Sequence, residues 1–167
     1  MRDTGRKTAA WAARYSLLVA LAMVLSWLES MIPLPVAIPG VKLGLTNLVV
    51  IFALYRMSLW DAACISMIRV VLVAMTFGNA YSLAYSFVGA VLSLTVMALL
   101  KQSERFSVVG VSIAGGITHN MGQIFAAIAV LKTARIAWYL PALMISGTLA
   151  GIVIGTVGGV LTERVRV

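Results

Sequence analysis

Apolar segments close to the length of a membrane-spanning helix fill most of this chain, and short charged connections separate them. A helix that crosses the hydrocarbon core of a bilayer needs roughly 20 apolar residues. Of the 167 residues, 62% are hydrophobic and 11% are charged, whereas about a quarter of a soluble domain is charged. We therefore predict a multi-pass protein of the cell membrane.

The lipid environment limits the possible fold classes. Lipid satisfies no backbone hydrogen bonds, and the alternating pattern of a membrane barrel is absent, so helices remain. We predict one all-α transmembrane domain over residues 1–167, built as a bundle of six helices. The predicted helices cover residues 15–32, 42–55, 59–77, 81–100, 108–131 and 139–161.

Basic residues in the connections predict the orientation, because cytoplasmic loops are rich in Lys and Arg. Residues 1–14 are polar and basic, and we place them in the cytoplasm. The inner side then holds Arg2, Arg6, Lys7, Arg14, Arg56, Lys101, Arg105, Arg164 and Arg166. The outer side holds Lys42, Lys132 and Arg135. Both termini are therefore predicted to be cytoplasmic, and the proline-rich residues 33–41 form an outer loop.

Composition also argues against several functions. The basic residues behind the net charge of +8 flank the apolar segments and form no continuous stripe, which argues against nucleic-acid binding. The single cysteine, Cys64, excludes an internal disulfide and a cysteine-based metal cluster. The five acidic residues form no cluster that would hold Mg²⁺ for prenyl transfer, and no phosphate-binding loop is present. We expect no catalytic residues, metal or cofactor, and predict that the protein is not an enzyme.

The stretch over residues 33–47, PLPVAIPGVKLGLTN, is the longest break between apolar segments. Proline fixes φ and donates no backbone hydrogen bond, so this stretch cannot be a regular helix. It places Lys42 and Asn47 near the start of the predicted second helix. A cation beside free backbone N–H groups suits an anionic or polar ligand, and we predict that both residues bind it.

Polar residues within the membrane point to the same ligand, because they are costly there and mark functional sites. Arg69 lies near the middle of the third helix. His119 and Gln123 share one face of the fifth helix, with Asn120 beside them, and Tyr85 lies in the outer half of the fourth. We predict that these residues converge with Lys42 and Asn47 around one substrate in the outer half of the bundle.

Each of these residues also has a structural alternative. Arg69 could form an ion pair with Glu29 or Asp61, and Lys42 could anchor the chain at the interface. The three polar residues of the fifth helix could join helices by hydrogen bonds, and Tyr85 could belong to the aromatic belt.

Small residues at four-residue spacing allow close helix packing. The sixth helix carries a glycine ridge, which most often serves packing within the same bundle. Its members are Gly147, Gly151, Gly155 and Gly159. The first helix has a lesser version in Ala12, Ser16 and Ala20, where docking to a partner and internal packing are both open.

The segments PGVKLGLTNLVVIFALY, YSFVGAVLS and GGITHNMGQ, together with the segment around Arg69, resemble a family of small membrane proteins. These proteins are called "heptaprenyl diphosphate synthase component I" or "Gx transporter", and the resemblance covers nearly the whole chain. They are similar to the substrate-binding S components of energy-coupling-factor (ECF) transporters. The resemblance implies an outer pocket at the polar positions above, and docking through the first helix onto a transmembrane coupling subunit driven by cytoplasmic ATPases.

We therefore predict a membrane subunit that captures a small polar or anionic vitamin or precursor for an ECF-type importer. The ligand is isoprenoid-related if the synthase name records real context. Two alternatives remain open. One is a membrane anchor of a flavin- or quinone-linked electron-transfer complex, and the other is an accessory subunit of a prenyl diphosphate synthase.

Overall fold

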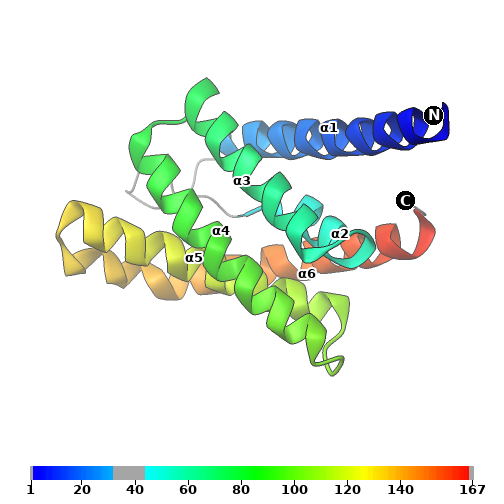
Figure 1. The fold of residues 1–167 in the computed structure, drawn as a ribbon. Helices are drawn as coiled ribbons and strands as arrows, with labels where there is room; N and C mark the ends of the chain where they lie inside the picture. The colour runs from blue at the N-terminus through cyan, green and yellow to red at the C-terminus, as the bar shows by residue number, and fades with distance from the viewer. Residues whose placement is uncertain (1, 32–43, 166–167) are drawn as a thin grey trace.

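The computed structural model describes residues 2–31 and 44–165, and every regular element in that part of the chain is a helix. The elements are α1 (Arg2–Ser30), α2 (Asn47–Arg56), α3 (Leu59–Thr76), α4 (Ala80–Gln102), α5 (Val108–Leu131), the 3-10 helix η1 (Ala134–Tyr139) and α6 (Leu140–Arg164). Five segments are long and apolar enough to cross a membrane. The predicted all-α bundle of six helices is confirmed, and the protein is a multi-pass membrane protein (Figure 1).

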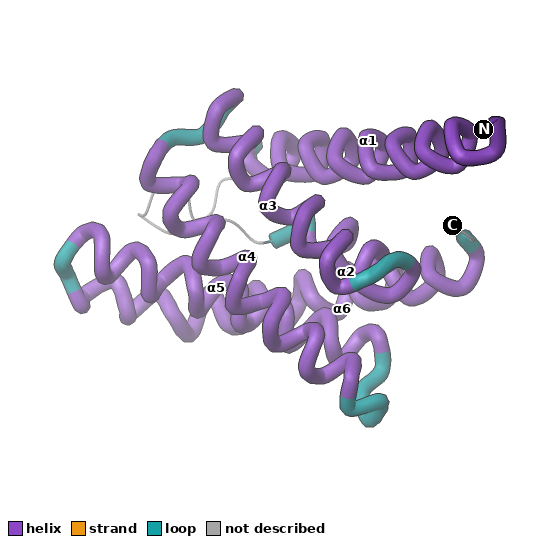
Figure 2. The backbone as a smooth tube through the Cα atoms, in the orientation of Figure 1, coloured by secondary structure: helices purple, strands orange, loops and turns teal. Residues whose placement is uncertain are grey.

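Side-chain caps fix where α3, α4 and α5 begin. Ser58, Asn79 and Ser107 precede these helices, and each side-chain oxygen accepts a hydrogen bond from the backbone N–H three residues later. At α4 the bond is reciprocal, since Ser82 Oγ also accepts from the Asn79 backbone N–H. The predicted ranges 59–77, 81–100 and 108–131 agree closely with the structure for this reason, and short turns join these helices (Figure 2).

The second helix differs from its prediction. We predicted a helix over residues 42–55, whereas α2 begins at Asn47 and has 10 residues. Gly44 adopts a left-handed φ of 90°, and its carbonyl accepts a hydrogen bond from the Asn47 N–H at 2.8 Å, so a tight turn replaces the first helical turn. Ten residues span only about 15 Å, half of the hydrocarbon core. α2 is instead a core helix, buried at every position from 49 to 54.

Glycine brings α5 and α6 into backbone contact. A Cβ atom added to Gly116 of α5 would lie 2.4 Å from the Gly147 carbonyl oxygen of α6. Added to Gly151 or Gly155 it would lie 2.5 or 2.6 Å from the α5 backbone, while at Gly159 the nearest atom is 4.0 Å away. The glycine ridge therefore packs within the bundle over most of its length, as predicted.

The first helix lies at the edge of the bundle. It packs along α3, where the Tyr15 hydroxyl donates a hydrogen bond to the Asp61 carboxylate. Its other sides expose large apolar side chains such as Leu17, Val24 and Trp27. We predicted its start near residue 15, but the helix continues back to Arg2 and extends past the start of α3 (Figure 1). No proline interrupts these residues, so nothing in them ends the helix.

Candidate ligand-binding site

Buried polar side chains meet where the start of α2 contacts α1, α3 and α5. We call this group the polar cluster. Its members are Glu29, Asn47, Arg69, His119 and Gln123. Each is at most 4% exposed, although polar groups inside a membrane protein are costly unless they are paired or functional.

Glu29 ties α1 to the turn before α2. Its Oε1 atom accepts hydrogen bonds from two successive backbone N–H groups, those of Gly44 and Leu45, the latter at 3.3 Å. The left-handed Gly44 turns both N–H groups to the same side, where a carboxylate can accept them. The carboxylate also interacts electrostatically with Arg69, so it is one reason why a guanidinium is tolerated on α3.

Arg69 has hydrogen-bonding capacity that the described residues leave unused. Its side chain is 2% exposed, and neither Nε nor Nη2 has a hydrogen-bond partner within residues 2–31 and 44–165. These two nitrogens lie on the same edge of the planar guanidinium. That edge matches the two oxygens of a carboxylate or a phosphate, which it binds in bidentate fashion.

The fifth helix contributes a histidine–glutamine pair. His119 Nε2 and Gln123 Nε2 lie 2.8 Å apart, as the four-residue spacing on one helix face predicts. A Cβ atom on Gly89 of α4 would lie 2.8 Å from the His119 carbonyl oxygen and 3.2 Å from its ring, so glycine lets α4 approach this part of α5 closely. On its other side the ring faces Gly44, whose added Cβ would lie 3.4 Å from His119 Cδ2 and 3.2 Å from Asn47 Nδ2.

Four of the predicted substrate-binding residues are connected around Gly44. Asn47 and His119 lie beside it and Gln123 pairs with His119, while Arg69 interacts with Glu29, which accepts a hydrogen bond from the Gly44 N–H. The remaining three are placed differently or not at all. Asn120 Nδ2 donates to the Leu143 carbonyl of α6 at 2.6 Å, so this side chain joins two helices. Tyr85 is buried in an apolar cluster with residues of α5 and α6. Lys42 lies outside the described residues, as does the predicted outer loop over residues 33–41.

The predicted docking residues lie where a partner could reach them. Ala12, Ser16 and Ala20 are exposed on α1, and the face that they form is distinct from the face that packs on α3. The structure holds one chain, so docking itself stays a prediction.

Two residues of the site were missed or undervalued by the sequence interpretation. Glu29 was considered as an ion-pair partner, but its main contacts are to the backbone before α2. Gly89 was not singled out. A glycine inside an apolar helical segment signals close approach of another group, and YSFVGAVLS carries that signal.

Comparisons with known proteins give one match. A family model described as "Heptaprenyl diphosphate synthase component I" matches residues 18–161. Searches of curated proteins and of solved structures found no match. Our prediction that the protein is not an enzyme is wrong at this level, because the family is named as a component of a synthase. The predicted resemblance is confirmed over most of the chain, and the protein belongs to the heptaprenyl diphosphate synthase component I family.

Proposed function

We propose that this protein is the membrane subunit that captures a small anionic or polar ligand in the polar cluster, in the manner of an S component of an ECF-type importer. The observation that carries the proposal is the free Nε and Nη2 edge of Arg69 among the described residues. A buried guanidinium with an open bidentate edge is well suited to a carboxylate or phosphate oxygen pair.

The neighbours of Arg69 suit such a ligand. The Glu29 carboxylate offsets part of the guanidinium charge in the absence of ligand, and backbone N–H groups hold that carboxylate in place. Asn47, His119 and Gln123 add groups that can donate or accept hydrogen bonds. The site would therefore recognise a ligand by one anionic end and by further polar groups.

Transport requires partners, and the exposed face of Ala12, Ser16 and Ala20 supports docking onto a transmembrane coupling subunit. Cytoplasmic ATPases would supply the energy, since the chain has no phosphate-binding loop. The ligand would then enter from the outer side, where the start of α2 lies in the predicted orientation.

That orientation has its own test. We propose that both termini are cytoplasmic, because the basic residues collect at the end of the bundle where α2 meets α3. Cys64 is exposed and is replaced first by Ser. A single cysteine at the exposed Ala134 should then react with an impermeant thiol reagent from outside, and one at the exposed Ser103 only after the membrane is opened. The opposite pattern would reject the orientation.

A second candidate function is favoured by the family description. The protein could be an accessory membrane subunit of a prenyl diphosphate synthase, with a diphosphate as the anion that Arg69 binds. Coexpression with a candidate synthase chain separates the two proposals. Prenyl transfer that depends on this protein supports the synthase role, and ligand uptake that depends on ATPases supports import.

Native mass spectrometry of gently purified protein tests ligand capture in both cases. We expect a small anionic molecule bound to the wild-type protein, and none bound to Arg69→Met. Arg135→Met removes an exposed arginine of η1 and is the matched control, which should retain the ligand. Equal occupancy in all three proteins, or no bound molecule in any, would reject capture at Arg69.

A further inference from the structure

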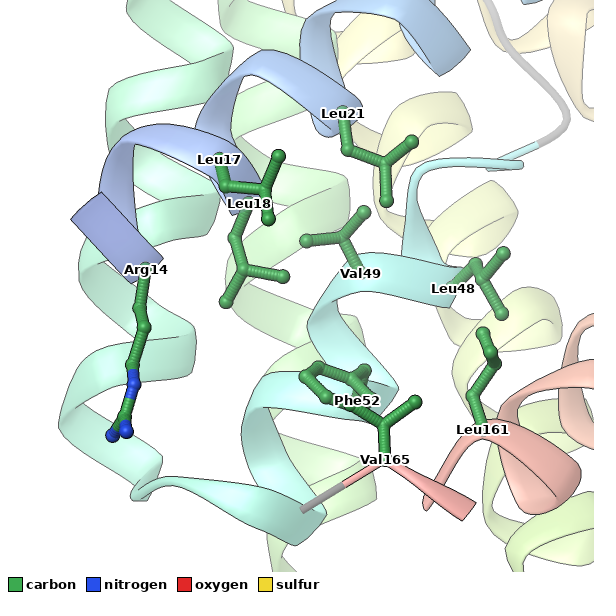
Figure 3. Close-up of a pocket in the computed structure, with 9 residues that line it drawn as sticks. All are labelled: Arg14, Leu17, Leu18, Leu21, Leu48, Val49, Phe52, Leu161 and Val165. Carbon is green, nitrogen blue, oxygen red and sulfur yellow. The ribbon is translucent and has the colours of Figure 1, made fainter. Parts of the chain in front are cut away.

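An apolar groove lies along one side of α2, and none of the residues that line it belongs to the polar cluster. It has a volume of about 390 Å³ and opens between α1 and α6, with α2 as its floor (Figure 3). The apolar side chains that line it are Leu17, Leu18, Leu21, Leu48, Val49, Phe52, Leu161 and Val165.

Among the described residues that line the groove, Arg14 is the one that carries a charge. Arg14 extends from α1 at the end where α2 finishes (Figure 3). A second cation lies close by, because Arg56 Nε donates to the carbonyl of the lining residue Val165 at 3.0 Å. The groove thus combines a long apolar wall with guanidinium groups at one end.

This arrangement matches an amphiphile with an anionic headgroup. A free phosphate would make no favourable contact with the leucine-lined wall. A purely apolar partner helix would carry no group that pairs with Arg14. The lining side chains of α1 reach the outer surface of the bundle, since Leu17 is 70% and Leu21 43% exposed, so a lipid can enter the groove from the bilayer. The basic end of the protein is predicted to face the cytoplasmic leaflet, whose anionic lipids attract such cations.

We infer that this groove is a binding site for one anionic phospholipid, with an acyl chain along α2 and the phosphate on Arg14. The site does not depend on the proposed ligand capture, because none of the side chains that line the groove belongs to the polar cluster. It also leaves the face of Ala12, Ser16 and Ala20 free, since Leu17 and Leu21 project from a different side of α1.

The test is native mass spectrometry of the protein in micelles that contain equal amounts of phosphatidylglycerol and phosphatidylcholine with the same acyl chains. We expect one phosphatidylglycerol to remain bound to the wild-type protein. Arg14→Gln should reduce the preference for phosphatidylglycerol about fivefold, the effect of one surface cation. Arg105→Gln, a cation at the same end that does not line the groove, should leave the preference unchanged.

A second variant tests the apolar wall. Leu21 is 43% exposed at the rim, so Leu21→Trp can fill the groove without disturbing the core, and it should remove both lipids. Leu99→Trp changes an exposed residue of α4 and should remove neither. Equal retention of the two lipids by the wild-type protein would overturn the inference. A dimer that Leu21→Trp dissociates, with no lipid bound, would overturn it in favour of a second copy.

Discussion

The α5–α6 pair and α1 show two different ways of holding a helix in this bundle. Glycines bring the backbones of α5 and α6 together, with an added Cβ at Gly116 only 2.4 Å from a carbonyl oxygen of its neighbour. α1 packs along one side of α3 and leaves most of its surface exposed. The comparison indicates a rigid side and an open side, with the polar cluster where they meet. The rigid side can fix a site, whereas the open side is available to partners and lipid.

The largest expected effect concerns the site between the two sides. Arg69→Ala should weaken ligand binding by about 2–5 kcal/mol, as for truncation of one partner of a buried charge pair. Arg69→Lys keeps the charge but loses the bidentate edge, so it should also bind more weakly. Affinity and melting temperature are measured on the same proteins, with Arg135→Ala as the exposed control. Lower stability with unchanged affinity would show that Arg69 only balances the charge of Glu29.

The second prediction tests the close packing of α5 on α6 on the rigid side. Gly116→Val should destabilise the bundle by about 1–3 kcal/mol, because its side chain would overlap the α6 backbone. Ala12→Val on the exposed face of α1 should change stability by no more than about 0.5 kcal/mol. Thermal unfolding in detergent compares them. Equal stabilities would mean that the two sides do not differ in packing.

The third prediction separates Asn120 from its neighbour His119. Asn120→Ala should cost about 1 kcal/mol of stability, since it removes the hydrogen bond to the Leu143 carbonyl. Its ligand affinity should stay close to that of the wild-type protein, while His119→Ala should lower affinity without unfolding the bundle. A loss of ligand affinity in Asn120→Ala at unchanged stability would show that Asn120 contacts the ligand.

The smallest effect on stability is expected on the open side. Ser16→Leu and Ala20→Leu should alter stability by less than about 0.5 kcal/mol, because both positions are exposed. The same changes should abolish copurification with a coupling subunit, because close helix approach needs small residues. Unchanged copurification in the double variant would exclude this face as the docking surface.

Local chemistry explains which parts of the fold could be predicted. The starts of α3, α4 and α5 depend on caps at Ser58, Asn79 and Ser107, which the sequence displays beside the apolar segments. The start of α2 depends on the left-handed turn at Gly44, and the apolar pattern continues across it. Hydropathy alone therefore placed that start too early.

The site was predictable where helical spacing decides it. Four residues between His119 and Gln123 place them on one face in any α-helix. Asn120 lies about 100° further around α5, and only the packing of α6 shows that it faces the Leu143 carbonyl. The enzymatic prediction failed for another reason. Counting carboxylates in this chain does not exclude a part in a synthase, since the family is named as one component of it.

The short α2 has a consequence for how the chain is inserted. A helix of 10 residues cannot cross the bilayer by itself, so it cannot leave the insertion machinery as an independent span. Its final neighbours include α6, and Arg56 bonds to Val165, which is 109 residues later in the chain. Those partners exist only after synthesis has passed residue 165. The innermost helix of the bundle is therefore among the last to reach its native position.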